Sequence, residues 1–492
     1  MFSLKKSLSE YSISAQEHAL IKGRTLRIDS RQILPGDVFV ACQGEYVDGR
    51  DYIQAAIDNG ATFVFWDDDG QFCWRDEWKV PNAGVSDLKE RAGLVAAACY
   101  DYPGKHLAIW GITGTNGKTS ISQWLAQAAD KLGKKCAIMG TVGNGYWQQL
   151  QSTGNTTMDA VSNQTWLKHF VNEGAKAVAM EVSSHGLDQS RVVGVPFTSA
   201  VFTNLTRDHL DYHHDMDAYG ACKASLFYWH GLQHAIVNID DDFGWRLNQD
   251  LRQQCPHLAV YSYGFHSAAD IRILDFAVNA SQMQLHLMTP WGEAQVFTHL
   301  LGRFNALNLA ACVGVLCANG FALADVVSVW SEIKPATGRM DCLRGHNQPL
   351  VVVDYAHTPD ALEKALATLQ EIKPDHAKLW CIFGCGGDRD AGKRPLMGAA
   401  AAAGADCVVV TSDNPRTEDP LKIINDILPA VADPVLVEAD RRAAIGFAVS
   451  HAAVDDIILI AGKGHETYQD INGVKQHFSD FEVAQSALAL RD

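Results

Sequence analysis

The 492-residue sequence has no excess of positive charge, because 57 aspartate and glutamate residues outnumber 41 lysine and arginine residues. The formal net charge of −16 disfavours a protein that binds nucleic acid or an anionic membrane surface without specificity. The sequence also lacks an uninterrupted apolar run of the roughly 18 residues that span a bilayer, and its first residues contain no signal-peptide core. We therefore expect a cytoplasmic protein without membrane insertion, in which local basic groups bind any anionic substrate.

The 12 cysteines include no Cys-x-x-Cys pair. The nearest approach is the spacing of Cys381 and Cys385, which fits neither a zinc ribbon nor a thioredoxin-type motif. We expect most of the cysteines to be buried, reduced thiols.

Length and composition predict a globular protein of several domains. A content of 47% hydrophobic and 20% charged residues, with 40 glycines and 15 prolines, excludes disordered, collagen-like and low-complexity chains. At roughly 150 residues per domain, the length corresponds to about three domains. Pro-Gly and Pro-x-x-Gly segments interrupt the pattern near residues 104 and 337, so we predict domains at 1–104, 105–337 and 338–492.

Apolar runs that alternate with helical stretches predict an α/β fold in all three parts. In the first part, expected strands at 37–41 and 61–66 flank a helix, which indicates a small α/β domain. In the second part, buried strands between 107 and 237 favour a mainly parallel sheet, and residues 271–297 alternate as antiparallel strands do. Strands recur between 350 and 460, which predicts a Rossmann-like, doubly wound third domain.

The strongest local motif is GITGTNGKTS at residues 111–120, which follows an apolar strand and opens a helix. Glycines let backbone N–H groups close around phosphate oxygens, Lys118 can reach the β- and γ-phosphates, and Thr119 can ligate Mg²⁺. The motif departs from the general P-loop at Ile112, where a glycine is expected. A tight strand-to-helix turn would need neither the lysine nor the hydroxyl, so we predict a P-loop ATPase-like central domain.

Other polar residues of the central part have two interpretations each. Glu181 ends a buried strand and is a candidate metal-side carboxylate. The segment 208–214, which contains His209, is either a polar loop with surface histidines or part of a site after a strand tip. Asn305 and Asn308 share a helical face, although one of them could instead be an N-cap.

Four strand-end loops of the third part carry polar residues, and they begin near Asp354, Gly384, Ser412 and Gly462. Open α/β sheets bind ligands outside the carboxyl ends of their strands, so four such loops predict a crevice. The second loop is not a dinucleotide fingerprint, because Arg389 replaces its last glycine.

Many motifs in one order make the chain resemble the ATP-dependent Mur ligases of peptidoglycan synthesis over nearly its whole length. Besides the phosphate loop, the motifs are DSR at 29–31, DGR at 48–50, NTT at 155–157, EVSSHGL at 181–187, TNL at 203–205, DHLD at 208–211, the Asn305/Asn308 pair, GRM at 338–340, DYAHTP at 354–359, GCGGDRD at 384–390, DNPR at 413–416 and GKGHE at 462–466. Ser120 is a minor departure, since the family often has a second threonine there. The resemblance implies one domain for the UDP end of a substrate, a central ATPase domain and a Rossmann-like domain for an amino acid.

The resemblance also implies the roles of individual residues. The catalytic residues would be Lys118, Glu181, His209 and Lys223, the last as a carbamylated lysine. ATP would contact Gly114, Thr115, Asn116, Gly117, Lys118, Thr119, Ser120, Asn305, Arg339 and Asp354. Mg²⁺ would be bound by Thr119, Glu181, His209 and Lys223. The UDP-muramoyl dipeptide would contact Ile28, Ser30, Glu45, Tyr46, Val47, Asn155, Thr156, Thr157, Ser183, Gln189 and Arg191. The amino acid would contact Arg389, Asp413, Asn414, Pro415, Arg416, Gly462 and Glu466.

The implied activity is addition of a third amino acid to UDP-N-acetylmuramoyl-L-alanyl-D-glutamate. A carboxylate is a poor electrophile, so its D-glutamate side chain is expected to become an acyl phosphate at the expense of ATP before the amine attacks. We expect meso-diaminopimelate as the amino acid, because the Arg416 guanidinium can bind its distal carboxylate through two parallel hydrogen bonds. In the competing interpretation, Arg416 is a surface residue after a proline turn.

Three alternatives remain for the function. One is an L-lysine-adding ligase of the same family, in which Arg416 would have no distal carboxylate to bind. A folylpolyglutamate synthetase-like ligase shares the central architecture, but the DSR and DNPR motifs speak against it. A nucleotide-switched assembly protein would hydrolyse ATP without forming a bond. We expect small-molecule substrates and a monomer.

Overall fold

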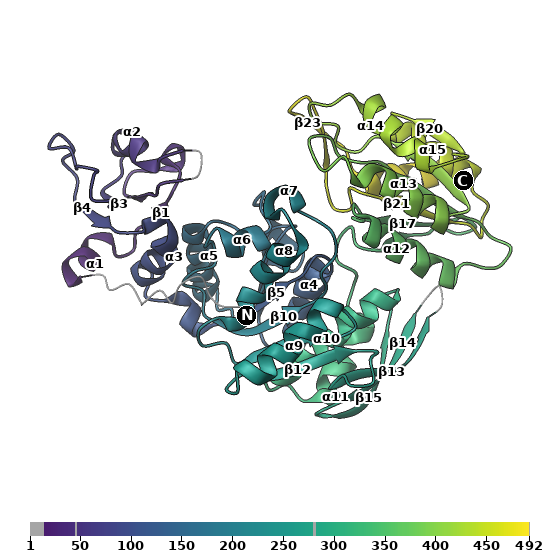
Figure 1. The fold of residues 1–492 in the computed structure, drawn as a ribbon, viewed down its shortest axis with the longest axis horizontal. Coiled ribbons are helices and arrows are strands. Elements are labelled where there is room, and N and C mark those ends of the chain that lie inside the picture. Colours follow the sequence, from purple (N-terminus) through teal and green to yellow (C-terminus); the bar gives the residue numbers. More distant parts are fainter. Residues whose placement is uncertain (1–13, 45–46, 279–281, 492) are drawn as a thin grey trace.

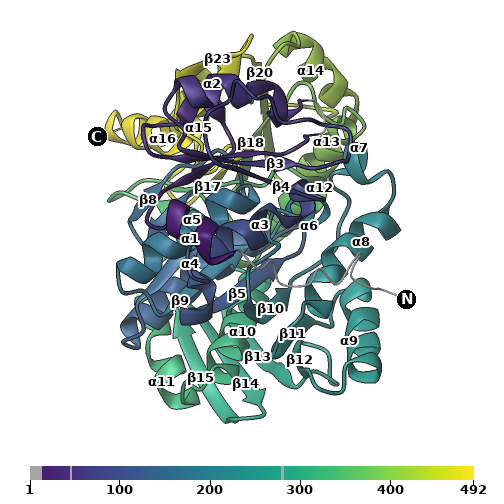
Figure 2. The same cartoon turned by 90° about the vertical axis from the view of Figure 1, so that its left-hand side faces the viewer.

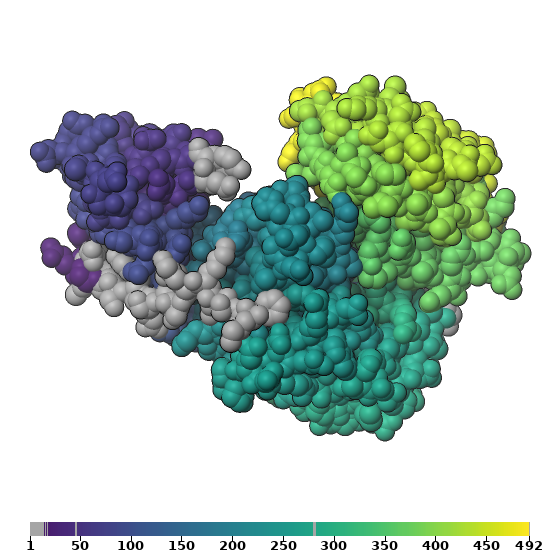
Figure 3. Space-filling view, viewed as in Figure 1, coloured from purple at the N-terminus to yellow at the C-terminus, as the bar shows by residue number. Residues whose placement is uncertain are grey.

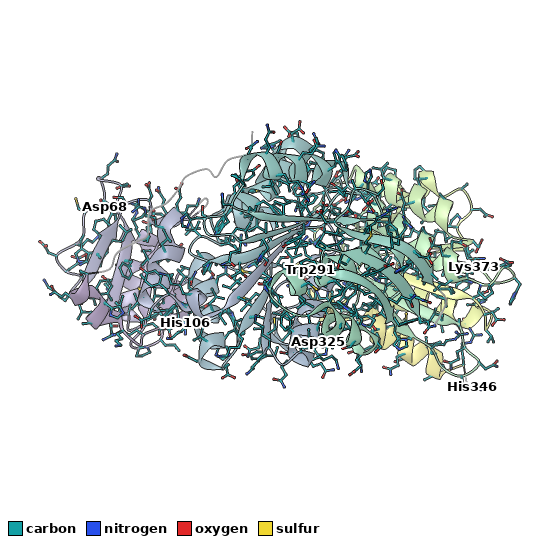
Figure 4. All side chains as sticks on the ribbon, turned by 90° about the horizontal axis from the view of Figure 1, so that it is seen from below. Asp68, His106, Trp291, Asp325, His346 and Lys373 are labelled. Atoms are coloured by element: carbon teal, nitrogen blue, oxygen red, sulfur yellow. The ribbon has the colours of Figure 1, made fainter. Side chains whose placement is uncertain are left out.

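The computed structural model describes residues 14–44, 47–278 and 282–491, and it arranges them as three parts in a row (Figure 1). Glu45 and Tyr46, two of the residues expected at the nucleotide, lie outside the described residues. The first and third parts are separate masses on either side of the central part, with open space between them (Figure 3). Seen from below, Asp68 marks the end of the first part, and Lys373 and His346 mark the end of the third (Figure 4).

The first part contains a four-stranded parallel sheet. Its strands, in spatial order, are β1 (Leu26–Arg27), β2 (Val38–Ala41), β3 (Phe63–Asp67) and β4 (Asn82–Val85). Its helices are α1 (Ala15–Ile21), α2 (Ile53–Asp58) and α3 (Leu88–Cys99). Because side chains alternate along a strand, Val38 and Val40 pack with α3, whereas Phe39 and Ala41 pack with α2. Helix α3 also packs against α5 (Ala160–Asn172) of the central part (Figure 2).

The central part contains an eleven-stranded sheet in the order β15-β14-β13-β12-β11-β10-β5-β9-β6-β7-β8. The strands are β5 (Ala108–Thr113), β6 (Cys136–Met139), β7 (Asn144–Tyr146), β8 (Gln149–Gln151), β9 (Ala177–Glu181), β10 (Phe197–Phe202), β11 (His234–Asn238), β12 (Ala259–Gly264), β13 (Ile271–Val278), β14 (Met283–Thr289) and β15 (Gly292–Thr298). Neighbours from β13 to β6 pair in parallel, and the strands at both ends pair antiparallel. The mainly parallel sheet with an antiparallel end was predicted from the sequence.

Helices cover both faces of the central sheet. They are α4 (Lys118–Lys131), α5, α6 (Ser184–Asp188), α7 (Leu210–His213), α8 (Met216–Ala224), α9 (Asp242–Gln254), α10 (Arg303–Ala318) and α11 (Leu323–Ser328). Helices α4 and α10 pack on one face with Trp110 and Ile112, and helices α5 and α9 pack on the other with Ile109 and Val178. The strands are therefore buried on both faces, as their continuous apolar runs indicate.

The third part is a six-stranded sheet in the order β16-β17-β21-β18-β19-β20, with a separate hairpin β22-β23. The strands are β16 (Asp341–Leu343), β17 (Leu350–Asp354), β18 (Leu379–Phe383), β19 (Cys407–Thr411), β20 (Leu436–Glu438), β21 (Ile457–Ala461), β22 (Tyr468–Ile471) and β23 (Val474–His477). Helices α12 (Pro359–Ile372), α13 (Lys393–Gly404) and α14 (Pro420–Ile427) cover one face, and α15 (Arg441–His451) and α16 (Asp480–Ala489) cover the other. Within this sheet only β16 pairs antiparallel, so the doubly wound prediction is confirmed.

Several smaller expectations can be compared with the structure. All 12 cysteines are free and most are buried, as predicted. The N-cap of α10 is Gly302, so the alternative that Asn305 or Asn308 caps this helix is wrong. None of the helices in the described ranges is long and apolar enough to cross a membrane. The domain limits at 104 and 337 stay predictions.

Candidate functional site

The phosphate loop runs from the end of β5 into α4 and packs closely against α10. Gly114 and Gly117 have φ angles of 141° and 90°, which residues with a side chain rarely adopt. A Cβ atom on Gly117 would lie 2.6 Å from Asn308 Oδ1. Asn308 Nδ2 in turn donates to Asn305 Oδ1 at 3.1 Å. The asparagine pair of α10 therefore lies directly against the loop.

Two lysines converge on the backbone of this loop. Lys118 Nζ donates to the carbonyl oxygens of Gly114 and Thr115, both at 2.8 Å, and Lys223 Nζ donates to Gly114 O at 3.0 Å. Burial lowers the pKa of Lys118, and burial together with the Lys118 charge lowers the pKa of Lys223 well below its ordinary value. Lysine side chains next to a glycine-rich loop fit a polyphosphate ligand.

Glu181 accepts hydrogen bonds from Thr119, in the first turn of α4, and from Thr141. Its Oε2 accepts from Thr119 Oγ1 at 3.0 Å and from Thr141 Oγ1 at 2.8 Å, and its Oε1 accepts from Thr141 N at 3.1 Å. Carboxylate and hydroxyl oxygens suit Mg²⁺, which keeps several waters and is commonly shared with substrate phosphates. Thr119 and Glu181 therefore fit the expected magnesium site, and Thr141 is a residue that the sequence analysis missed.

His209 and Lys223 both lie near the Tyr219 ring. The His209 and Tyr219 rings are 6.1 Å apart, and Lys223 Nζ lies 4.3 Å from the centre of the Tyr219 ring. Burial lowers the pKa of His209 to about 4, so its ring is neutral near pH 7 and able to bind a metal. Among the described residues, His209 makes no hydrogen bond to Thr119 or Glu181, and no group of three or more His, Cys, Asp or Glu side chains is suited to a metal. The roles of His209 and Lys223 at Mg²⁺ stay predictions.

The third part reaches the phosphate loop at two places. Arg339 Nη2 lies 3.5 Å from Thr119 Oγ1, and its guanidinium stacks 4.5 Å from the centre of the Tyr355 ring. Asn116 Nδ2 donates to Asp360 Oδ2 at 3.2 Å, a contact that no local motif indicated. The start of the central helix and its phosphate loop thus contact the third part, which carries the expected ATP-site residue Arg339.

Asp354, at the end of β17, hydrogen-bonds the backbone next to Arg339. Its Oδ2 accepts a hydrogen bond from Met340 N at 2.8 Å, which holds the residue next to Arg339 in place. Burial raises the pKa of Asp354.

The residues expected at the muramoyl dipeptide form a connected group beside Glu181. Thr157 Oγ1 donates to Glu181 O at 3.0 Å and accepts from Ser183 N at 3.0 Å. Arg191 Nη1 donates to Thr157 O at 2.8 Å, and Arg191 Nε donates to Gln189 Oε1 at 2.9 Å. The structure therefore places these four predicted residues in one network next to the phosphate loop.

Two other members of this predicted set differ in their surroundings. Thr156 Oγ1 accepts a hydrogen bond from Thr141 Oγ1 at 3.0 Å, so Thr156 belongs to the same network. Asn155 is exposed, and its backbone carbonyl accepts from Thr153 Oγ1 at 3.3 Å. Asn155 is thus open to solvent in this arrangement.

The described residues expected at the uridine nucleotide lie in the first part. Ile28 and Val47 expose apolar side chains, whereas Ser30 is buried at the start of the 3-10 helix Ser30–Gln32. Asn59 Nδ2 donates to Ser30 O at 2.9 Å. Two exposed apolar side chains suit a flat nucleobase, but the structure gives no contact that joins them.

The strand-end loops of the third part form a second polar site. Lys463, which is fully buried, donates from Nζ to Asn414 Oδ1 and to Glu466 Oε2, both at 3.0 Å. Asn414 Nδ2 donates to the same Glu466 Oε2 at 2.8 Å. A Cβ atom on Gly462 would lie 2.7 Å from Asp413 Oδ2, so the loops after β19 and β21 touch. Lys463 was missed as a site residue, although its place between two glycines in a strand-end loop was a signal.

Arg416 adopts a left-handed backbone conformation, with φ at 51°. Its N–H donates to Asp470 O at 3.0 Å and its carbonyl accepts from Asn472 N at 2.7 Å, so the β22-β23 hairpin holds it. The half-buried side chain donates from Nη1 to Gly387 O in the loop that carries Arg389. Arg389 itself is exposed, and Pro415 is buried. Arg416 is therefore held between two loops rather than free on the surface.

The two sites differ in the chemistry that they suit. The first has backbone amides, two lysines, a hydroxyl and a carboxylate, which suit a nucleoside triphosphate with Mg²⁺. The second combines Lys463 and Arg416 with Asp413 and Glu466, which suits a ligand that carries both charges. An enzyme that uses ATP to attach a small zwitterion would need both sites.

Comparison with family models assigns all three parts. The model described as "Mur ligase family, catalytic domain" matches residues 24–100, "Mur ligase middle domain" matches 112–316, and "Mur ligase, glutamate ligase domain" matches 338–464. Each match corresponds to one sheet of the structure and the helices around it.

Curated relatives match along the whole length of the chain. The protein named UDP-N-acetylmuramoyl-L-alanyl-D-glutamate--2,6-diaminopimelate ligase from Neisseria meningitidis serogroup A is 64% identical over 100% of both chains. The protein of the same name from Chromobacterium violaceum is 56% identical over 94% of both. A solved structure of a ligase with this name is 37% identical, covers 95% of both chains and has a TM-score of 0.68.

Proposed function

The chain belongs to the Mur ligase family, and on that premise we propose that it joins meso-diaminopimelate to the D-glutamate of UDP-N-acetylmuramoyl-L-alanyl-D-glutamate with hydrolysis of ATP to ADP and phosphate. The observation that carries the proposal is the pair of sites on the central and third parts: a phosphate loop with two lysines and a strand-end site of mixed charge. Full-length relatives of that name support the choice of substrates. The reaction belongs to cytoplasmic peptidoglycan precursor synthesis, where ATP and UDP-linked substrates are available.

ATP binds at the loop of residues 114–120, with Asn305, Arg339 and Asp354 around it. Thr119 and Glu181 are the residues that fit Mg²⁺, and His209 and a carbamylated Lys223 are the further ligands that we propose. When bound, Mg²⁺ supplies positive charge to the phosphate oxygens. Carbamylation requires a neutral amine, and the lowered pKa of Lys223 supports that requirement.

The chain's own residues explain how a carboxylate becomes reactive. A D-glutamate carboxylate oxygen bonds to the γ-phosphorus of ATP while the bond from that phosphorus to the bridging oxygen of ADP breaks, which yields an acyl phosphate. Lys118 is placed to stabilise the charge on the transferring group, since its ammonium already lies against the loop. The amine of diaminopimelate then attacks the acyl carbon, loses a proton and expels phosphate.

The dipeptide and the amino acid approach from opposite sides of the phosphate loop in this proposal. Thr156, Thr157, Ser183, Gln189 and Arg191 bind the muramoyl dipeptide, together with Asn155. The uridine nucleotide lies in the first part, against Ile28, Ser30, Glu45, Tyr46 and Val47. The diaminopimelate lies against Arg389, Asp413, Asn414, Pro415, Arg416, Gly462 and Glu466.

The test is turnover by the purified protein. Phosphate release should require the UDP-linked dipeptide and diaminopimelate together, because an acyl phosphate is productive only when an amine captures it. ATP hydrolysis at the same rate without both substrates would favour the nucleotide-switched assembly protein. The folylpolyglutamate alternative is disfavoured, because the "Mur ligase family, catalytic domain" model matches the first part. A monomer is the expected state, which sedimentation can measure.

A further inference from the structure

Lys463 lies at the centre of the strand-end site, and no part of it is exposed. Its ammonium contacts Asn414 Oδ1 and Glu466 Oε2 at 3.0 Å each, and it lies 3.9 Å from Asp413 Oδ1. A buried ammonium is costly unless its surroundings compensate it, and these three oxygens do so. The proposed reaction gives this lysine no role.

Lys463 fixes which way the Asn414 amide faces. Asn414 Oδ1 lies between Lys463 Nζ and Asp470 N, each at 3.0 Å, and both of these groups can only donate. The amide oxygen must therefore be on that side, and Nδ2 must be on the other. There Nδ2 donates one N–H to Glu466 Oε2 at 2.8 Å, and its second N–H has no acceptor among the residues that the structure describes.

Glu466 is oriented in the same way. Its Oε2 accepts from both Lys463 and Asn414, whereas its Oε1 accepts from none of the described residues. The site therefore offers one free donor on Asn414 next to one free acceptor on Glu466. This pair is complementary to a carboxylate and an ammonium on the same carbon.

The charges of the site also suit a group that carries both a carboxylate and an ammonium. Lys463 and Arg416 balance Asp413 and Glu466, and the Arg441–Asp480 pair beneath them, at 2.7 Å, is neutral on its own. The distal end of diaminopimelate is a zwitterion, whereas the distal end of lysine is a cation. Loss of Lys463 would leave the site with an extra negative charge, which favours a cation over a zwitterion.

We propose that Lys463 is a positioning residue that makes this site select diaminopimelate over lysine. It acts through Asn414 and Glu466, by holding one as a donor and the other as an acceptor, and through the charge balance. The inference rests on the proposed function, since it concerns the amino acid of that reaction.

The experiment compares the full-length wild type with K463M, which keeps the length of the side chain and removes its charge. The matched control is K475M: Lys475 Nζ stacks on the same Tyr468 ring as Lys463, at 4.2 Å against 5.5 Å, but it is exposed on β23. KM and kcat are measured for diaminopimelate, for L-lysine, for ATP and for the UDP-linked dipeptide.

We expect K463M to raise the KM for diaminopimelate at least tenfold and to lower the diaminopimelate-to-lysine ratio of kcat/KM at least tenfold, with the KM for ATP within threefold of wild type. K475M should match the wild type. A wild type that does not use diaminopimelate would refute the proposed function. A wild type that does, with an unchanged ratio in K463M, would refute the role of Lys463 alone.

A second variant covers the case in which K463M does not fold. K463Q keeps a donor toward Asn414 Oδ1 but lacks the charge. Its diaminopimelate-to-lysine ratio of kcat/KM should therefore lie between the ratios of the wild type and K463M. Where K463M yields no folded protein, the ratio of K463Q should lie below that of the wild type. Wild-type selectivity in K463Q would contradict the charge balance that the proposal requires.

Discussion

Lys118 and Lys223, which are 105 positions apart in the sequence, donate to the same carbonyl oxygen, that of Gly114. Burial lowers the pKa of both lysines, and the charge of Lys118 lowers the pKa of Lys223 further, which favours the neutral amine that carbamylation of Lys223 requires. Phosphate oxygens at the loop would pair with the Lys118 ammonium. The relationship makes both lysines testable as parts of the ATP site.

The first prediction is that Lys118→Ala abolishes turnover without loss of the fold. Among the described residues, the Lys118 ammonium donates hydrogen bonds only to the loop backbone, so its removal should leave the melting temperature nearly unchanged while phosphate release falls more than tenfold. Lys131→Ala, at the far end of the same helix α4, is the control and should retain activity. Activity of Lys118→Ala within tenfold of wild type, about 1.4 kcal/mol of barrier, would contradict the loop assignment.

The second prediction concerns carbamylation of Lys223. Lys223→Ala should be nearly inactive, and an added short carboxylic acid should restore part of the activity, because its anion can occupy the place of the carbamate. Lys118→Ala should not respond to the same acid. Full activity of Lys223→Ala would remove this residue from the reaction.

The third prediction is that Arg416→Ala loses the preference for diaminopimelate. The guanidinium is held by the loop at Gly387, where it can pair with a distal carboxylate that lysine lacks. The ratio of kcat/KM for diaminopimelate to that for L-lysine should fall at least tenfold. Arg442→Ala, an exposed arginine of α15, is the control. A ratio that stays unchanged in Arg416→Ala would show that another group binds that carboxylate.

The fourth prediction is a loss of stability in mild acid through His465. Burial, with the nearby charge of Arg339, lowers its pKa to about 4 from an ordinary 6.5. The unfolded chain therefore binds the proton first, so the contribution is fully present above pH 6.5 and is lost as the pH falls toward 4. Denaturant unfolding should show His465→Asn to be less pH-dependent than wild type by about 3 kcal/mol across this window. The exposed His257→Asn is the control, and equal pH dependence in His465→Asn and wild type would exclude this histidine.

The features that could be predicted are those that depend on residues close together in the sequence. The phosphate loop, Glu181 at the end of β9 and the strand-end loops of the third part all follow from local spacing and from the alternation of apolar runs. Asn305 and Asn308 could be placed on one face, but their approach to Gly117 could not be read from the helix alone.

The contacts that were missed join residues far apart in the chain. Thr141 meets Glu181 across 40 positions, Lys463 meets Asn414 across 49, and Asn116 meets Asp360 across 244. Each depends on how strands and domains are placed in space, which periodicity does not specify. The left-handed backbone of Arg416 was missed for the same reason, because the β22-β23 hairpin that holds it lies about 55 residues further along the chain.

The most direct test of the central claim is the mass of the product. The purified protein is mixed with ATP, Mg²⁺ and UDP-N-acetylmuramoyl-L-alanyl-D-glutamate, amino acids are added singly, and each mixture is examined by mass spectrometry. The account predicts a product heavier by one diaminopimelate less one water, formed together with stoichiometric phosphate. Formation of the lysine adduct in preference, or vigorous ATP hydrolysis with neither co-substrate present, would contradict it.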